Sequence, residues 1–256
     1  MRHSKVEIRD VMMEVGRNLL VDEGLGIGAG DLTFKRVFDR VEATHGVRLT
    51  NASVIRRVWE NQAEFRDDVL AEVARAGDTA GDTGSTVEAA LSLFPSLDLS
   101  TPEGRLRGMS QMARVGGEAG LRAMVTSRHW SLWVGVWILA VTSPPSQRGR
   151  QIRGALLDGY ETTTGTWEDL HGSMVSGLGL RVREPFELRQ FTVAVGALIE
   201  GCALRHGTAR DGDAIVRPTG PDGALEEWTL VGVGLEALML RFLEIDPDWV
   251  APDPVA

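Results

Sequence analysis

Basic and polar side chains that can bond nucleic acid are concentrated between Thr33 and Trp59. This stretch holds six lysine and arginine residues against two acidic ones, whereas the whole chain carries a net charge of −9. Arg56 and Arg57 are its sharpest feature, because a guanidinium group can form two hydrogen bonds to the edge of a guanine base. The stretch therefore predicts contact with DNA. The alternative is a chance excess of charge and two solvated arginines on a surface helix.

Nine residues are predicted to contact DNA, and each has a basic or small polar side chain. They are Thr33, Lys35, Arg36, Arg48, Thr50, Asn51, Ser53, Arg56 and Arg57. Arg56 and Arg57 are the predicted base readers. The threonines, the asparagine and the serine lie near predicted helix starts, where polar groups bond phosphate oxygens. A small basic island on an acidic chain is typical of a protein that reads a particular DNA sequence.

The spacing of apolar residues predicts the helices that position this stretch. Apolar residues recur every three or four positions from Ile8 until Gly24, which predicts a first helix that ends near this glycine. A second helix is expected to begin at an Asp31 or Thr33 cap and to end near Gly46. The predicted DNA contacts therefore begin at the start of the second helix.

A third, short helix is expected within Thr50–Trp59, with Thr50, Asn51 or Ser53 as its cap. A fourth helix is expected to open at Asn61, which is followed three residues later by a glutamate, as in a capping box. Trp59 is expected to pack in the core rather than to contact bases. The third helix would then carry both arginines on its outer face.

Four motifs occupy corresponding places in these segments. They are Thr33-Phe-Lys-Arg-Val-Phe at the start of the second helix, His45-Gly46-Val47 in the turn, Val54-Ile55-Arg56-Arg57-Val58-Trp59 in the recognition helix and Asn61-Gln62-Ala63-Glu64-Phe65 at the start of the fourth helix. Together they resemble the DNA-binding domain of the tetracycline-repressor (TetR) family. The resemblance covers about residues 6–75, under a third of the chain.

The stretch departs from the family pattern in three ways. About three additional residues lie around Arg48–Thr50, between the turn and the recognition helix. Arg56 stands where the family often has a phosphate-contacting tyrosine, and Gln62 stands where it has a lysine. These departures bear on the operator sequence and the exact contact residues more than on DNA binding itself.

The resemblance implies an all-α, homodimeric transcription regulator. It implies an N-terminal three-helix helix-turn-helix domain at residues 1–77 and a helical domain for ligand binding and dimerisation at residues 85–246. Such a regulator is expected to be a repressor that a small, largely apolar effector releases from a double-stranded DNA operator. The alternative is a TetR-like homodimer that binds a ligand or a protein and has lost DNA binding.

Beyond the first four segments, the composition changes abruptly. The run Gly77-Asp-Thr-Ala-Gly-Asp-Thr-Gly84 has no apolar spacing and predicts the boundary between the domains. Further helices are expected at about 86–94, 103–127, 129–141, 146–175, 186–206 and 224–244, and no alternating strand pattern is evident. Residues 207–223, which contain two prolines, are expected to form an irregular connection.

Aromatic residues of the second domain predict the effector site. Trp130, Trp133 and Trp137 share one helical face, and Trp167 lies on a helix that can oppose it. The predicted effector-binding residues are Met124, Trp130, Trp133, Trp137, Tyr160, Thr163, Trp167 and Met174. Aromatic rings, thioethers and hydroxyl groups suit a largely apolar ligand. The alternative is that these side chains fill the core.

Two apolar seams near the C-terminus predict the dimer interface. The first consists of Leu188, Phe191, Val195, Leu198 and Cys202, and the second of Trp228, Val231, Leu235, Leu238 and Phe242. Both show the alternating spacing of three and four residues that is typical of packed helices. Two such helix pairs, one from each protomer, would form a four-helix interface. The alternative is that both seams face the protomer's own core.

Other motifs argue against an enzyme. The five histidines show no metal-ligand spacing, so no metal is expected. The glycine-rich run after Gly24 follows a predicted helix rather than a strand, so no nucleotide cofactor is expected. A single cysteine excludes an intrachain disulfide. No secretory or membrane-spanning segment is evident, and a cytoplasmic protein without catalytic residues or cofactors is expected.

Overall fold

The computed structural model describes residues 4–25, 29–77, 83–142, 146–206, 214–219 and 223–250. These residues are mostly helical, which agrees with the predicted all-α class at the coarse level. They belong to two compact units, and each is described by itself below.

Unit 1 is built from two separate stretches of the chain. It comprises residues up to 81 together with residues 128–162, while unit 2 comprises residues 82–127 and 163 onwards. The division therefore differs from the predicted boundaries, because residues 128–162 pack with the N-terminal helices and complete their apolar core. Most of the predicted linker, residues 78–82, lies outside the described residues.

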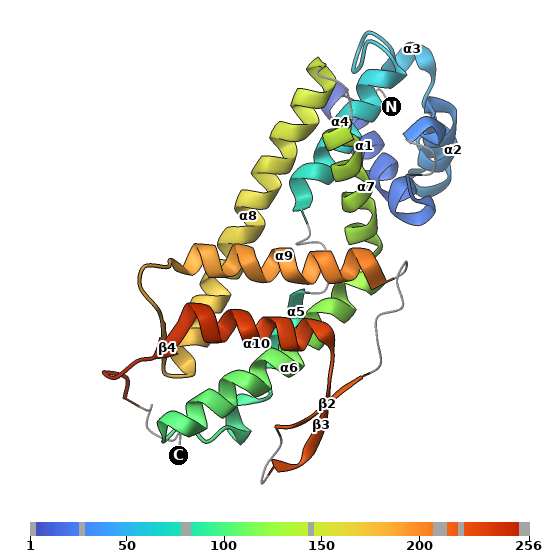
Figure 1. Cartoon of the computed structure of the whole chain (residues 1–256). Helices are drawn as coiled ribbons and strands as arrows, with labels where there is room; N and C mark the ends of the chain where they lie inside the picture. The colour runs from blue at the N-terminus through green and yellow to red at the C-terminus, as the bar shows by residue number, and fades with distance from the viewer. Residues whose placement is uncertain are drawn as a thin grey trace. The chain divides into compact units, whose positions relative to one another are not determined.

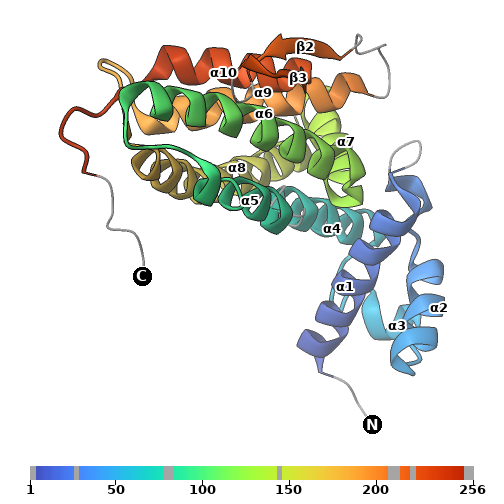
Figure 2. The same ribbon diagram turned by 90° about the horizontal axis from the view of Figure 1, so that it is seen from below.

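The helices of unit 1 begin and end largely where local signals predict. They are α1 (Lys5–Glu23), α2 (Phe34–His45), α3 (Asn51–Val54), α4 (Gln62–Ala76), α7 (Arg128–Thr142) and the first part of α8 (Gln147–Gly177), with a 3₁₀ turn at Ala29–Asp31 (Figure 2). Thr33 caps α2 and Asn61 caps α4, as predicted. Each cap accepts a hydrogen bond from a backbone N–H and contributes about 1 kcal/mol.

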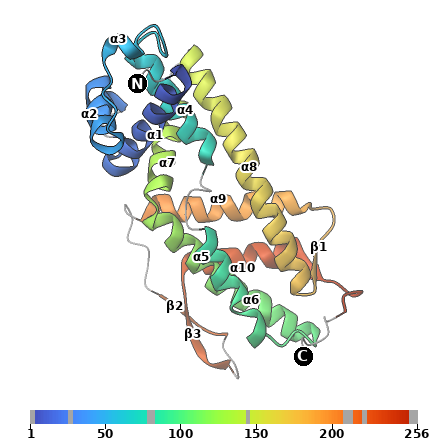
Figure 3. The same cartoon turned by 180° about the vertical axis from the view of Figure 1, so that it is seen from behind.

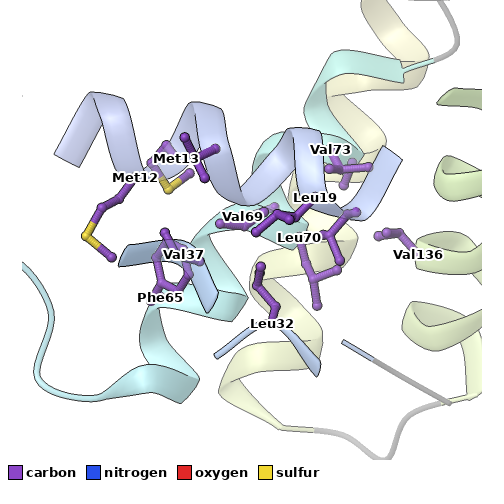
Figure 4. Packing of buried hydrophobic residues seen from close by; sticks show 14 of the residues in the cluster. Met12, Met13, Leu19, Leu32, Val37, Phe65, Val69, Leu70, Val73 and Val136 are labelled. Atoms are coloured by element: carbon purple, nitrogen blue, oxygen red, sulfur yellow. The ribbon is translucent and has the colours of Figure 1, made fainter. Parts of the chain in front are cut away.

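Helices α1, α2, α4 and α7 enclose the core of unit 1. Met12, Val37 and Phe65 have no exposed surface, and Figure 4 shows Val136 of α7 beside side chains of α1 and α4. Each buried side chain of this size contributes about 1.5–3 kcal/mol. This core fixes α2 by its apolar side and leaves its charged side at the surface.

The third predicted helix is much shorter than expected. Helix α3 ends at Val54, and Ile55–Trp59 forms a tight turn closed by a bridge between its two ends. Arg56 in this turn has a φ of 60°, which a right-handed helix does not accommodate. The prediction of a helix through Trp59 is therefore wrong. The apolar residues behind that prediction anchor a turn to the core instead.

The described part of unit 2 consists of helices and two small two-stranded sheets. Its elements are α5 (Thr83–Leu91), α6 (Pro102–Thr126), the second part of α8, β1 (Leu180–Val182), α9 (Leu188–His206), β2 (Ile215–Pro218), β3 (Leu225–Trp228), α10 (Leu230–Phe242) and β4 (Leu243–Ile245). Helices α9 and α10 run antiparallel and side by side, and α6 packs against both (Figure 1). Helix α5 lies along α6 (Figure 3).

The strands of unit 2 were not predicted. Strands β2 and β3 pair antiparallel, with Ile215 opposite Trp228, and β1 pairs antiparallel with β4, with Leu180 opposite Ile245. The helix expected at 224–244 therefore begins only at Leu230, because the residues before it form a hairpin with part of the expected irregular connection.

The two predicted seams lie inside unit 2. Phe191, Val195 and Leu235 belong to its core, and the other described seam residues are Leu188, Leu198, Cys202, Trp228, Val231, Leu238 and Phe242, all buried or half-buried. In the single chain, both seams pack in the protomer's own core, as the alternative interpretation expects. Helix α6 supplies the apolar surface that a partner was expected to supply, since Gly117 permits close approach to Gly232 on α10.

A polar cluster fastens the β2–β3 hairpin to α10. Arg217 forms an ion pair with Glu236, a residue of α10 that is only 8% exposed, and its guanidinium carbon lies 4.5 Å from the centre of the Trp228 ring. The Trp228 indole N–H donates to Thr219 Oγ1 at 2.7 Å, and this hydroxyl donates to Glu226 at 2.9 Å. The hairpin is therefore an integral part of unit 2.

Candidate nucleic-acid interface

Helix α2 is held in place at its N-terminus by two side chains. Thr33 Oγ1 accepts a hydrogen bond from the Arg36 N–H at 3.3 Å, and Gln62 Oε1 of α4 accepts one from the Phe34 N–H at 2.9 Å. Arg66 of α4 donates to the Leu32 carbonyl at 2.8 Å. The resemblance placed Gln62 at a lysine position, and in this fold the glutamine caps α2 from the neighbouring helix.

The basic residues of unit 1 divide into paired and unpaired groups. Arg36 forms an ion pair with Glu23 at the end of α1, and Arg40 lies 3.9 Å from Asp22. Lys35, Arg48 and Arg56 are exposed and form no ion pair within the described part of the chain. Arg57 is also exposed. The unpaired cations are therefore the better candidates for binding phosphate or base edges.

The turn Ile55–Trp59 presents Arg56 and Arg57 at its outer end. The Arg56 N–H donates to the Trp59 carbonyl at 2.8 Å, and the Val58 N–H donates to the Val54 carbonyl at 2.9 Å. Val54 and Trp59 are buried, while Ile55 and Val58 pack partly buried against the same core. Of the residues in the turn, only the two arginines are exposed.

Asp68 of α4 joins the arginine turn to two other helices. Its Oδ2 accepts from the Trp59 indole N–H at 2.9 Å and from Arg9 of α1 at 2.8 Å, and its Oδ1 lies 3.4 Å from the Gln151 amide nitrogen of α8. The expectation that Trp59 packs in the core is confirmed. Sequence reasoning missed Asp68, because no periodicity or motif distinguishes it from other surface carboxylates of an amphipathic helix.

The small polar residues predicted to bind phosphate are partly engaged within the chain. Ser53 Oγ donates to the Thr50 carbonyl at 2.7 Å and accepts from the Thr50 N–H at 2.9 Å, so its hydroxyl hydrogen is already used. Thr50 and Asn51 are exposed beside it. Thr50 and Asn51 therefore stay predicted contacts, whereas Ser53 has a structural role that closes α3.

The predicted effector residues belong to both units. In unit 1, Trp130 and Trp133 are buried, Trp133 packs edge-to-face on Tyr160 with ring centres 5.0 Å apart, and Trp137 is 40% exposed. The Trp133 indole nitrogen is buried without a hydrogen-bond partner among the described residues. In unit 2, the half-buried residues are Met124, Thr163, Trp167 and Met174. A common pocket for all eight residues stays a prediction.

One hollow in unit 1 lies away from the predicted aromatic face. It is lined by Leu19, Leu20, Glu23, Gly24, Leu25, Asp31, Leu32 and Arg36. Beside it, Leu25 packs tightly over Gly135 of α7, where a Cβ atom would lie 2.4 Å from the leucine Cδ1. This contact explains why residue 135 of α7 is a glycine.

His171 is a half-buried titratable group in unit 2. Its Nδ1 lies 3.0 Å from Thr192 Oγ1, and its ring packs against Trp167 and Phe191 at centre distances of 5.8 and 5.4 Å. Desolvation by burial lowers the pKa of His171 from 6.5 to about 4, because the charged imidazolium loses its hydration. The imidazole is therefore neutral at physiological pH.

The outer faces of α9 and α10 are partly apolar. Val193 and Leu204 of α9 and Leu230 and Leu240 of α10 are each about half exposed or more. Space beside Gly196 of α9 is open, since a Cβ atom there would meet nothing within 4 Å. A dimer through these helices would use these outer residues instead of the buried seams.

Among the described residues, no group of three or more histidine, cysteine or carboxylate side chains is arranged to hold a metal ion. The lone Cys202 is half-buried on α9. None of the helices in the described ranges combines the length and the apolar character needed to cross a membrane.

Comparison with known proteins adds no assignment: no protein-family model and no curated protein matches this chain.

Proposed function

We propose that this protein is a sequence-specific regulator of transcription whose unit 1 binds double-stranded DNA. The observation that carries the proposal is a set of exposed cations, Lys35, Arg48 and Arg56, that form no ion pair with the described residues and belong to a well-packed helical unit of an otherwise acidic protein. Cations that form no internal ion pair are available to replace counterions on DNA phosphates. The resemblance of the first four segments to the TetR family supports the same function.

Regulation by a small effector is part of this proposal. The buried indole N–H of Trp133 has no acceptor among the described residues, and a buried donor without an acceptor is destabilising unless another group bonds to it. A largely apolar effector with one oxygen acceptor would supply the missing hydrogen bond. Such an effector releases DNA only if it binds the two states of the protein with different affinities.

A homodimer through the outer faces of α9 and α10 completes the proposal. Two copies would bring two arginine turns to successive faces of the duplex, about 34–36 Å apart, and would favour a nearly palindromic operator. The exposed Val193 and Leu230 are the apolar residues that association would bury.

The proposal is tested by selection of duplexes from a random library with the full-length protein. The recovered duplex is then titrated at about 50 and 200 mM salt, where we expect the affinity to fall at least about tenfold as counterions are released. Lys35→Gln should lower the slope of this salt dependence by about 1. Arg181→Gln, at an exposed arginine of unit 2, is the matched control and should leave the slope unchanged. Failure of the folded protein to enrich any duplex would overturn the proposal.

The second candidate is a TetR-like homodimer that binds a ligand or protein without DNA. The short α3 favours it, because four helical residues provide no recognition helix of ordinary length. A ligand that stabilises the protein against heat, in a protein that enriches no duplex from the library, is the result expected for this function.

A further inference from the structure

We propose that the turn Ile55–Trp59 is itself the base-reading element and that Arg56 reads a guanine through the major groove. This inference rests on the proposed function, since it assumes that unit 1 binds double-stranded DNA. It differs from the expectation of a recognition helix, because the helix ends at Val54 before either arginine. The turn therefore has to present the arginines without helical geometry.

The backbone of the turn is fixed by a closed set of hydrogen bonds. The Arg56 N–H donates to the Trp59 carbonyl at 2.8 Å, while the Val54 carbonyl accepts from the N–H groups of Arg57 and Val58 at 3.2 and 2.9 Å. Arg56 occupies the left-handed region with a φ of 60°, the only described non-glycine residue to do so. Such a conformation costs an ordinary residue about 1 kcal/mol or more, so the surrounding contacts must enforce it.

The side chains around the arginines anchor the turn to unit 1. Val54 and Trp59 are buried at its two ends, and the Trp59 indole N–H donates to Asp68 at 2.9 Å. Arg9 donates to the same carboxylate oxygen at 2.8 Å and lies over the Trp59 ring. A rigid base of this kind reduces the entropy that Arg56 loses when it binds, which is the advantage of preorganisation.

The dimensions of the turn favour the major groove. Its ends form a β-bridge, and bridged backbone segments lie about 5 Å apart between their centres. With its atoms included, such a turn is wider than a minor groove of about 6 Å and fits a major groove of about 12 Å. The major-groove edge of guanine offers O6 and N7, two acceptors that match the arginine fork. Two arginines at the tip limit direct reading to one or two base pairs per protomer.

The first experiment replaces single guanines of the selected duplex by 7-deazaguanine and measures the Kd of the full-length protein. This base lacks the N7 acceptor but keeps its Watson–Crick pairing and its minor-groove edge. We expect one guanine in each half-site at which the substitution weakens binding about 5- to 100-fold. We expect distamycin, which occupies the minor groove, to leave the affinity unchanged.

The second experiment changes the arginine instead of the base. Arg56→Lys keeps the positive charge but loses the bidentate fork, so it should bind native DNA about as weakly as wild-type protein binds the 7-deazaguanine duplex. The sensitivity to 7-deazaguanine should disappear in this variant. Arg48→Lys is the matched control, since Arg48 is an exposed arginine of the same unit outside the turn, and it should keep that sensitivity.

The outcomes separate the two proposals. A protein that selects a duplex but is indifferent to 7-deazaguanine at every position would overturn the base-reading role and leave the proposed function standing. Competition by distamycin would also overturn it, in favour of insertion into the minor groove. A protein that selects no duplex would overturn both proposals. Arg56→Gly, which suits the left-handed backbone, shows whether any loss of binding comes from the missing side chain rather than from misfolding.

Discussion

Two arginines of the stretch Thr33–Trp59 in unit 1 and the arginine of the hairpin β2–β3 in unit 2 have opposite roles. In the first region, Arg48 and Arg56 are exposed and form no ion pair within the described residues. In the second, Arg217 pairs with the nearly buried Glu236 and covers the ring of Trp228. The same side chain is thus available to a partner in one region and is committed to the fold in the other.

This difference shows which sequence feature separates the two roles. The outward Arg48 and Arg56 lie in the later part of the stretch, where no acidic residue occurs between Glu42 and Glu60. Arg36 and Arg40 of its earlier part pair with acidic residues of α1. Arg217 instead forms an ion pair with Glu236, the single acidic residue of α10. The sequence of α10, LVGVGLEALMLRF, is otherwise apolar apart from one arginine. A charged residue that must be buried on an apolar helix requires a partner, because an isolated buried charge is very costly. A lone acid in an apolar helix is therefore a signal for an inward-facing arginine elsewhere.

The largest effect is expected from a substitution that removes the ion pair between Arg217 and Glu236. Arg217→Ala should destabilise unit 2 by about 3 kcal/mol, because it leaves Glu236 without its counter-charge and uncovers Trp228. The measurement is the free energy of unfolding from urea denaturation, monitored by tryptophan fluorescence. Arg181→Ala is the control, since the pair Arg181–Glu244 is more exposed than the pair Arg217–Glu236 and should contribute at most about 1 kcal/mol. Equal effects of the two substitutions would contradict the distinction.

The second prediction concerns the stability of unit 2 at low pH. The pKa of His171 falls to about 4 in the folded chain and returns to about 6.5 on unfolding, so the unfolded state binds the extra proton between these values. Stability should be constant above about pH 6.5 for this group, and about 2–3 kcal/mol should be lost as the pH falls towards 4. His171→Gln should remove this part of the pH dependence, as measured by denaturation at a series of pH values. His45→Gln, at an exposed histidine of α2, should leave it intact.

The smallest effect is expected from a substitution of Arg56, the exposed arginine with a left-handed backbone. Arg56→Gly should stabilise unit 1 by up to about 1 kcal/mol, because glycine adopts the left-handed backbone without steric cost. Thermal denaturation should show a slightly higher Tm, while DNA affinity falls. A drop in stability would instead mean that the Arg56 side chain contributes to the fold as Arg217 does.

Local signals predicted α2 and α4 because the information lies within each helix. Thr33 and Asn61 are good N-caps, and the apolar residues after them follow helical spacing. Segment Val54–Trp59 has apolar residues at positions that suit a helix equally well, yet it forms a turn. The deciding contact, Trp59 with Asp68, joins two elements and leaves no trace in local spacing.

Longer-range pairing explains the other departures from prediction. The sequence Leu225–Trp228 contains two adjacent glutamates and shows no clear alternation, so its strand character depends on the partner strand β2. The seams of α9 and α10 were recognised correctly as packing surfaces. The sequence left open whether a second protomer or the protomer's own core covers them, because spacing reveals that a face is buried but not which surface buries it.

During synthesis, unit 1 cannot finish folding before part of unit 2 has also been made. Its core needs Trp133 and Val136 of α7 and Leu156 of α8, and residues 82–127, which belong to unit 2, are synthesised before them. The apolar side of α4 therefore stays exposed to solvent until α7 and α8 have been synthesised. Exposed apolar surface of this kind makes nascent chains prone to aggregation and to chaperone binding. For the same reason, an excised fragment 1–77 would lack part of its core, and a stable fragment that contains unit 1 would have to extend at least to residue 162.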